Sequence, residues 1–273
     1  QVRATAELAP LVGALERMLA GLRAAFQRQH DFLADAAHEL KTPVAILKSS
    51  LQALLQKPRQ AGEYRDAAAL ALDDVERLEA LLARMLQLAR AEQWAGSGAP
   101  PGELLPAAPT CDAACARLRP LARARAVTLR LGPMDDAVVR ADPEELELVW
   151  TNLLENAIRH TPAGGRVSIS CARAGAEMVV QVEDNGTGIS AAELPRLFER
   201  FHRADTSRAR ETGGFGLGLA ICKAIVEAYR GRIAVSSTLG RGTCVTVWLP
   251  LAADEANGGG VGQPAGAGEV QGP

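Results

Sequence analysis

The residues best suited to chemistry begin with His38, which is followed directly by Glu39 and, four positions on, by Thr42. On a helix these side chains lie within about one turn of each other. A neutral imidazole can attack a phosphoryl group when a neighbouring carboxylate stabilises or takes the proton of its other ring nitrogen. A helix histidine beside a glutamate is more often a surface pair, so these residues alone leave both interpretations open.

A second polar group lies on a predicted helix at 143–160. Asn152 and Asn156 are four positions apart and share one face, and Arg159 and His160 follow on the next turn. Amide oxygens suit Mg²⁺, and a guanidinium suits phosphate. A solvated helix face has the same composition, so the stripe alone does not establish a site.

Two glycine-rich runs follow this helix. In the first, Gly186 and Gly188 come just after Asp184, at the end of an alternating strand. Glycine lets the backbone turn sharply where a side chain would block a ligand, and the carboxylate can accept a hydrogen bond from an exocyclic amine such as that of adenine. An ordinary β-turn is the alternative for this run taken alone.

In the second run, Gly214, Gly216 and Gly218 precede an amphipathic helix, whose N-terminal N–H groups can face a phosphate. The run is neither a Walker loop nor a clear dinucleotide fingerprint, since no Gly-Lys-Ser/Thr follows it and no strand leads into it. The stretch before it contains Arg208 and Arg210 and little apolar content. We expect a lid that supplies positive charge to a triphosphate.

Long helices must position the histidine. Apolar residues recur every three or four positions from Leu8 to Leu55 and again over 63–92, with Pro58 between the two segments. This pattern predicts an antiparallel hairpin whose apolar stripe needs a partner, either a second copy in a four-helix bundle or the chain's own C-terminal half. Pro43 lies inside the first helix, and we expect a kink there that lets the region of His38 switch between arrangements.

After a Gly-, Ala- and Pro-rich linker, the pattern predicts an α+β domain with helices on one face of a mixed sheet. A Gly-rich end with almost no large apolar residues predicts disorder. The expected elements are helix 112–126, strands 127–131 and 137–140, helix 143–160, strands 166–173 and 177–184, helices 190–201 and 217–230, and strands 232–237 and 243–250.

Composition narrows the function classes. The 273 residues are 48% hydrophobic with a formal net charge of −2, which argues against nucleic-acid binding. No apolar run approaches the roughly 20 residues of a membrane helix. The chain opens inside a predicted helix, so we expect it to be a fragment of a longer protein.

Together these segments resemble the sensor histidine kinases of two-component systems, from about residue 6 to residue 250. Residues 32–43 are similar to the family's H box, which implies that His38 is phosphorylated, that Glu39 acts as the base and that Thr42 orients a water for dephosphorylation of the partner. Residues 152–161 are similar to the N box, which implies that Asn156 binds Mg²⁺. The resemblance further implies ATP contacts from Asn152, Arg159, His160, Asp184, Gly186, Gly188, Phe198, Phe201, Arg208, Arg210, Gly214, Gly216, Leu217, Gly218 and Leu219.

The resemblance implies a fold of two parts, a dimeric all-α helical hairpin that forms a four-helix bundle, followed by an α+β sandwich ATP-binding domain of the histidine kinase, gyrase and heat-shock chaperone type. It implies ATP and Mg²⁺ as cofactors and a response regulator as partner. It also implies that the chain is the cytoplasmic portion of a bacterial inner-membrane protein anchored upstream of Gln1. The expected segments are a HAMP-like helix (1–26), the hairpin (27–92), a linker (93–109), the ATP-binding domain (110–253) and a disordered tail (254–273).

Two positions depart from the family pattern. Phe215 stands where a small residue is usual, and Arg159 stands where lysine is common. Asn152 distinguishes the chain from the related hydrolases, which resemble its ATP-binding half and have a water-activating glutamate at that position. Transfer to His38 is therefore favoured over the alternatives of an ATPase and of a pseudokinase scaffold, and the linker permits transfer within a chain or between chains.

Overall fold

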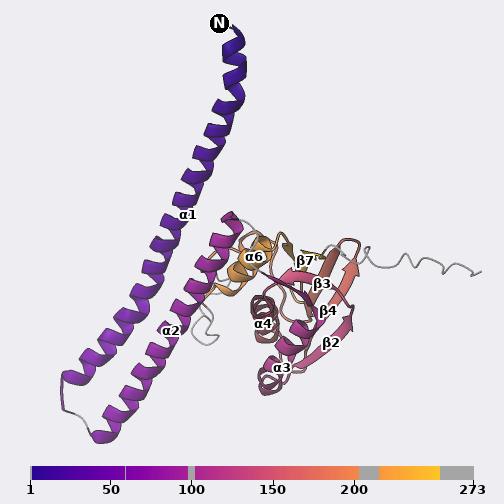
Figure 1. Ribbon diagram of the computed structural model, residues 1–273. Coiled ribbons are helices and arrows are strands. Elements are labelled where there is room, and N and C mark those ends of the chain that lie inside the picture. The colour runs from indigo at the N-terminus through magenta and orange to yellow at the C-terminus, as the bar shows by residue number, and fades with distance from the viewer. Residues whose placement is uncertain (1, 59, 98–101, 203–214, 253–273) are drawn as a thin grey trace, which may run out of the picture. The chain divides into compact units, whose positions relative to one another are not determined.

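The structure, a computed structural model, forms two compact units, and the chain is coloured by residue number in Figure 1. Within the described residues, no helix has both the length and the apolar composition needed to cross a bilayer. Arg208, Arg210, Gly214 and the tail 254–273, all subjects of sequence predictions, lie outside the described residues. The structure describes residues 2–58, 60–97, 102–202 and 215–252.

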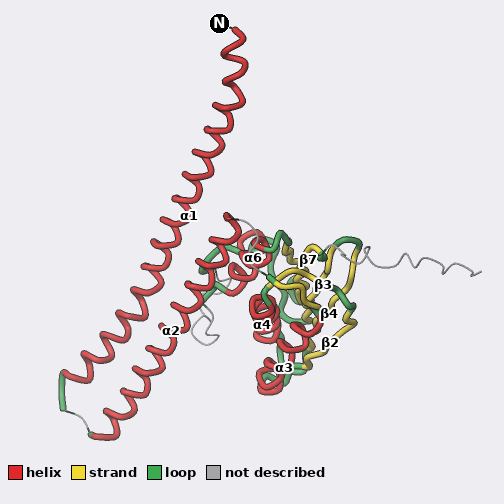
Figure 2. Tube along the Cα trace, in the orientation of Figure 1, coloured by secondary structure: helices red, strands yellow, loops and turns green. Residues whose placement is uncertain are grey.

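The first unit, residues 1–93 and 196–221, contains the predicted hairpin. Helix α1 (Val2–Leu55) and helix α2 (Ala61–Ser97) run antiparallel (Figures 1 and 2). Helix α1 passes without interruption through Pro43 and through the expected end of the HAMP-like helix at residue 26.

The hairpin leaves much of its apolar surface uncovered. Among the hairpin side chains that the structure describes, the buried apolar ones lie in the C-terminal half of α2, at Leu81, Met85, Leu88 and Ala91. Large apolar residues remain exposed along both helices, which is unusual for a surface that stays in water. Among them are Phe26, Leu33, Val44, Ile46, Leu51, Leu70, Leu72 and Leu82.

The second unit, residues 94–195 and 222–273, contains two sheets. Strand β1 (Glu103–Pro106) pairs antiparallel with β3 (Val138–Ala141). The main sheet is mixed, because its first pair, β2 and β4, is parallel and the other pairs are antiparallel. Its strand order is β2 (Thr128–Met134), β4 (Arg166–Ala174), β5 (Glu177–Asp184), β7 (Gly242–Pro250) and β6 (Arg232–Thr238).

Helices α3 (Ala108–Ala124) and α4 (Pro143–His160) cover one face of this sheet (Figures 1 and 2). Alternate residues of β4 and β5 are buried, and Trp150 of α4 is fully buried. The Trp150 indole Nε1 donates to Thr110 Oγ1 of α3 at 2.9 Å, so the two helices are joined inside the core. The predicted class, a helical hairpin followed by an α+β sandwich, is confirmed.

Local sequence explains why α4 forms where it does. Asp142 caps its N-terminus by accepting hydrogen bonds from the backbone N–H groups of Glu144 and Glu145, and Pro143 occupies the first turn, where its missing N–H is harmless. The Tyr229 hydroxyl, just beyond α6 (Gly218–Ala228), accepts from Asp142 N at 2.9 Å and donates to Glu145 Oε2 at 2.7 Å. The start of α4 is thereby fixed, and its last turn is positioned with it.

Two sequence predictions were wrong in detail. The expected linker 93–109 contains β1, whose pairing partner, β3, lies outside this segment. Helix α3 also begins within it, at Ala108, because Pro109 fits the first turn of a helix. The helix expected over 190–201 is replaced by turns and a 3₁₀ helix, η1 (Leu194–Arg196). Pro195 has no N–H to donate within a regular helix, which accounts for the break.

Candidate functional site

The polar stripe of α4 forms the centre of the candidate site. Asn152 is buried at 4% exposure, and Asn156, one turn later, is half-buried. The Asn152 Nδ2 group is buried without a hydrogen-bond partner among the described residues. An unpaired buried amide is unfavourable unless something accepts its hydrogen bond, so Asn152 Nδ2 is a donor for a bound ligand or water.

Asp184 lies at the end of β5, where backbone donors orient its carboxylate. Its Oδ1 accepts a hydrogen bond from Gly186 N at 2.8 Å and a second from Thr243 N, at the start of β7, at 3.2 Å. Desolvation raises the pKa of Asp184, and these two hydrogen bonds and the nearby His160 oppose that shift. The carboxylate is therefore partly withdrawn from water and fixed in direction.

The first glycine run joins the end of β5 to the end of α4. Thr187 N donates to His160 O at 3.1 Å, and a Cβ on Gly186 would lie only 2.3 Å from the same oxygen. Gly188 has a φ of +65°, and a Cβ there would lie 2.1 Å from Thr238 O. Both glycines are required by close approach of the backbone, and this brings Asp184 and His160 into one place.

His160 lies in a mixed electrostatic environment. Desolvation lowers its pKa, the Asp184 carboxylate opposes this shift, and the guanidiniums of Arg159 and Arg125 add to it. The imidazole is accordingly biased toward its neutral form, in which one ring nitrogen can accept a hydrogen bond.

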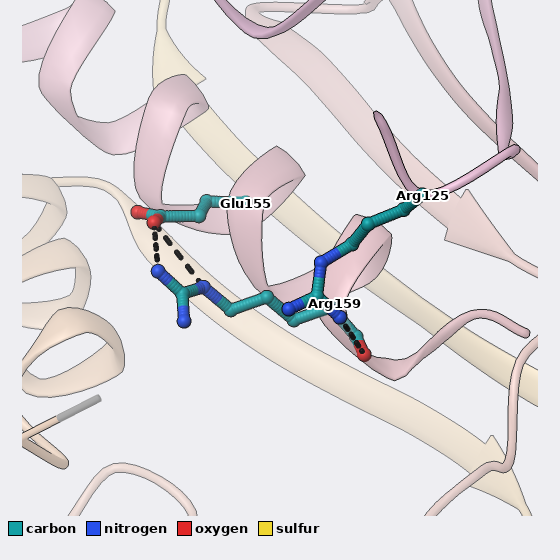
Figure 3. Close-up of polar contacts among 3 residues, drawn as sticks. All are labelled: Arg125, Glu155 and Arg159. Atoms are coloured by element: carbon teal, nitrogen blue, oxygen red, sulfur yellow. Dashed lines mark hydrogen bonds and ion pairs between the residues drawn. The ribbon is translucent and has the colours of Figure 1, made fainter. Parts of the chain in front are cut away.

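Arg159 pairs with a glutamate one turn earlier on α4 (Figure 3). Its Nη2 and Nε lie 2.5 and 3.2 Å from Glu155 Oε1. Arg125, at the C-terminal cap of α3, donates from Nη1 to the Arg159 carbonyl oxygen at 3.4 Å. The last turn of α4 therefore gathers two guanidiniums and one carboxylate.

The second glycine run belongs to the first compact unit. Gly216 has a φ of +70°, and a Cβ there would lie 2.7 Å from the carbonyl carbon of Phe201, which itself has a positive φ of 58°. Leu217 is fully buried, and α6 begins at Gly218. Phe198 and Leu219 are half-buried.

The candidate phosphoacceptor also lies in the first unit. The side chains of His38, Glu39 and Thr42 are all exposed on α1. A shallow hollow of about 530 Å³ lies along this face of the helix. It is lined by His38, Lys41, Thr42, Ala45, Ile46 and Ser49.

Arg200 makes a contact that sequence reasoning missed. Its Nη2 lies 2.7 Å from both carboxylate oxygens of Glu92 on α2, and its Nε lies 3.0 Å from Oε1. The guanidinium also lies 5.4 Å from the ring centroid of Phe32 on α1. The segment that follows Pro195 is thus bound to both helices of the hairpin within this unit.

Sequence reasoning also missed two residues, Gly242 and Thr243, that contact Asp184. Gly242 has a φ of +110°, and a Cβ there would lie 2.0 Å from Asp184 O, while the adjacent Thr243 supplies the second donor to Oδ1. The Gly-Arg-Gly pattern of residues 240–242 was a readable signal for a tight turn. That this turn lies beside Asp184 follows from the pairing of β5 with β7, which the local pattern does not reveal.

Comparison with known families gives two matches along the chain. Residues 28–94 match the His Kinase A (phospho-acceptor) domain, and residues 141–253 match the histidine kinase-, DNA gyrase B- and HSP90-like ATPase family. The first range contains His38, and the second contains Asn156 and Asp184.

Curated relatives are similar over most of the chain. The sensor histidine kinase CusS of Escherichia coli is 36% identical over 244 residues, which is 89% of this chain and 50% of the relative. The sensor protein IrlS of Burkholderia pseudomallei is 35% identical over 250 residues, with coverages of 92% and 53%. The chain thus spans about half the length of these relatives.

Solved structures are similar in fold. The Acinetobacter baumannii histidine kinase AdeS has a TM-score of 0.63 at 25% identity, covering 79% of this chain and 98% of that one. Full-length ShkA, solved in complex with AMPPNP, has a TM-score of 0.59 at 22% identity, covering 83% and 47%. With a phosphoacceptor hairpin ahead of an ATPase-type domain, the chain belongs to the sensor histidine kinases of two-component systems.

Proposed function

We propose that the chain transfers the γ-phosphoryl group of Mg-ATP to His38 and passes it on to an aspartate of a response regulator. The observation that carries this proposal is the fixed carboxylate of Asp184. Both of its backbone hydrogen bonds use Oδ1, and we assign the second oxygen, Oδ2, to accept from the exocyclic amine of adenine. Family membership and the exposed His38 support the same conclusion.

The residues of the second unit fit a magnesium nucleotide. Asn156 offers a neutral amide oxygen, a ligand that suits Mg²⁺ when phosphate oxygens complete the coordination. Asn152 offers an amide Nδ2 that is unpaired among the described residues, and Gly186 and Gly242 add no side chains of their own beside Asp184. When bound, Mg²⁺ neutralises charge on the phosphates that flank the bond to be broken.

Further contacts are proposed from the family resemblance. Arg159 and His160 would contact phosphate or ribose, and Gly216 and Gly218 would present backbone N–H groups to the phosphates. The other proposed ATP contacts are Gly186, Gly188, Phe198, Phe201, Arg208, Arg210, Gly214, Leu217 and Leu219.

His38 and Glu39 would carry out the transfer. Glu39 takes or stabilises the proton on one imidazole nitrogen while the other forms the bond to phosphorus and ADP leaves. Thr42, one turn along the same exposed face, is suited to orient a water for removing phosphate from the regulator. Asn152, a neutral amide where related hydrolases have a glutamate, cannot act as a base, which disfavours a simple ATPase.

The uncovered apolar stripe of α1 and α2 supports a homodimer formed through the hairpin. The chain covers about half of its curated relatives, which supports a longer protein. The family resemblance supports a HAMP-like helix over residues 1–26 and a membrane anchor upstream of Gln1, with residues 1–273 in the cytoplasm.

The test is incubation with γ-labelled ATP and Mg²⁺, followed by acid and base treatment of the labelled protein. We expect acid-labile, base-stable label that is absent from His38→Gln and retained by His30→Gln, a matched histidine exposed on the same helix. Label that survives in His38→Gln, or ATP turnover by His38→Ala at the unaltered rate, would refute the proposal.

A further inference from the structure

The ion pair between Glu155 and Arg159 is a distinctive feature of the last two turns of α4. The guanidinium contacts Oε1 through Nε at 3.2 Å and through Nη2 at 2.5 Å (Figure 3). The two side chains are only 21% and 25% exposed. The pair is therefore screened less by water than the surface pairs of this domain, such as Arg117 with Glu147.

The pair uses a particular edge of the guanidinium. Nε and Nη2 form the two-pronged edge with which arginine binds a carboxylate or a phosphate through parallel hydrogen bonds. Glu155 presents an anion to this edge from the same helix, four residues earlier, in the order that favours such pairs. An incoming phosphate that uses the same edge must displace the carboxylate.

The backbone around Arg159 is held independently of this pair. Arg125 donates to the Arg159 carbonyl oxygen, and Thr187 donates to the carbonyl of the next residue, His160. Exchange of Arg159 between Glu155 and a ligand therefore need not break these backbone hydrogen bonds. Release of the carboxylate leaves the end of α4 in place.

We propose that Glu155 is an affinity-determining residue of the nucleotide site, an internal anion that competes with the nucleotide phosphates for Arg159. This inference rests on the proposed function, because it assumes that Arg159 faces phosphate. Glu155 weakens binding of polyphosphate nucleotides and leaves binding of the nucleoside portion unchanged. Its carboxylate is released when the phosphates take the guanidinium.

The experiment measures Mg-ADP and adenosine binding by calorimetry to the unaltered chain and to Glu155→Gln, whose amide keeps the shape of the side chain and removes its charge. We expect Mg-ADP to bind about five-fold more tightly to the variant, since a partly exposed ion pair must no longer be broken. Adenosine affinity should not change. Glu147→Gln, which removes a paired carboxylate from the same helix, should leave both affinities unchanged.

A double-mutant cycle separates competition from the general effect of charge. In an Arg159→Gln background, Glu155→Gln should no longer tighten Mg-ADP binding. An equal gain in that background would overturn the proposal, because charge alone would then account for it. Weaker binding to Glu155→Gln alone would also overturn it, by showing that Glu155 orients Arg159 for the phosphates. Unchanged binding would overturn it by showing that Glu155 does not compete with them. If the unaltered chain binds no nucleotide at all, the proposed function fails instead.

Discussion

At the scale of single residues, Asp184 is expected to bind adenine, and its ionised carboxylate lowers the stability of the folded state because it is partly buried. Desolvation raises its pKa above the usual value of 3.8 despite two backbone donors. As the pH rises past 3.8, the unfolded chain therefore loses this proton before the folded chain does. The ionised carboxylate destabilises the folded state above its folded pKa, and the effect vanishes below 3.8, where both states are protonated.

Asp184→Asn should therefore abolish nucleotide binding without lowering stability. The amide oxygen can still accept from Gly186 and Thr243, and the charge is gone. We expect a Tm at neutral pH equal to or above that of the unaltered chain, with any gain disappearing below pH 3.8. Thermal unfolding of the variant and the unaltered chain over this pH range checks the prediction. It would be refuted if the difference in Tm, variant minus unaltered chain, were more negative at neutral pH than at acid pH.

Spacing along the chain predicted which residues could react but not what holds them. The i, i+4 pattern placed Asn152 and Asn156 on one face of α4, as observed. The same spacing relates Glu155 to Arg159, yet only the structure shows them as a pair. Contacts such as Thr243 with Asp184, 59 residues apart, depend on strand pairing and leave no local signal.

At the scale of elements, the turn after β5 depends on Gly188. A residue with a Cβ would be strained at its φ of +65° and would also collide with Thr238 O. Gly188→Ala should lower the free energy of unfolding by about 1–3 kcal/mol or more. Gly164→Ala is the matched control, because Gly164 also has a positive φ, of 84°, but has open space around it.

Urea unfolding of the two glycine variants separates strain from collision. Gly164→Ala should lose only about 1 kcal/mol, the ordinary cost of the left-handed backbone for a residue with a Cβ. Equal losses in both variants would show that the close approach of Thr238 O to Gly188 adds nothing to the cost of the backbone conformation.

Helix α1 continues through Pro43, one turn after Glu39, although proline cannot donate to the Glu39 carbonyl. Our hypothesis remains that this defect lets the turn around His38 bend. Pro43→Ala restores the missing donor and should raise helix stability by up to about 3 kcal/mol. It should also change the autophosphorylation rate, the dephosphorylation rate or both, as measured with purified regulator. Unchanged rates for both reactions would refute the hypothesis.

At the scale of the whole molecule, the uncovered stripe of the hairpin predicts self-association. Leu51 is 44% exposed on α1, and Leu239, in the turn between β6 and β7, is 68% exposed. Leu51→Glu should shift the protein from dimer to monomer, since burying a charge in a bundle core is unfavourable. Leu239→Glu should leave the dimer intact. Sedimentation velocity distinguishes these outcomes, and a monomeric unaltered chain would contradict the prediction.

Periodicity predicted both long helices and most elements of the ATP-binding domain because each is set by a local repeat of apolar residues. The repeat is every three or four positions in a helix and every second position in a strand. Strand order was not predictable in this way, since a period of two does not specify a partner, and β7 lies between β5 and β6. Strand β1 was missed because four residues in a Pro- and Gly-rich segment carry too little pattern. Pro195 was a visible sign against a helix over 190–201.

The central claim is that the protein phosphorylates itself on His38. Its most direct test is peptide mapping by mass spectrometry, under conditions that preserve phosphohistidine, after incubation with Mg-ATP. We predict a phosphoryl group on the peptide containing His38 and none on that peptide from Asp184→Asn. A phosphoryl group found only on another residue, or none while the protein binds Mg-ATP, would contradict this claim.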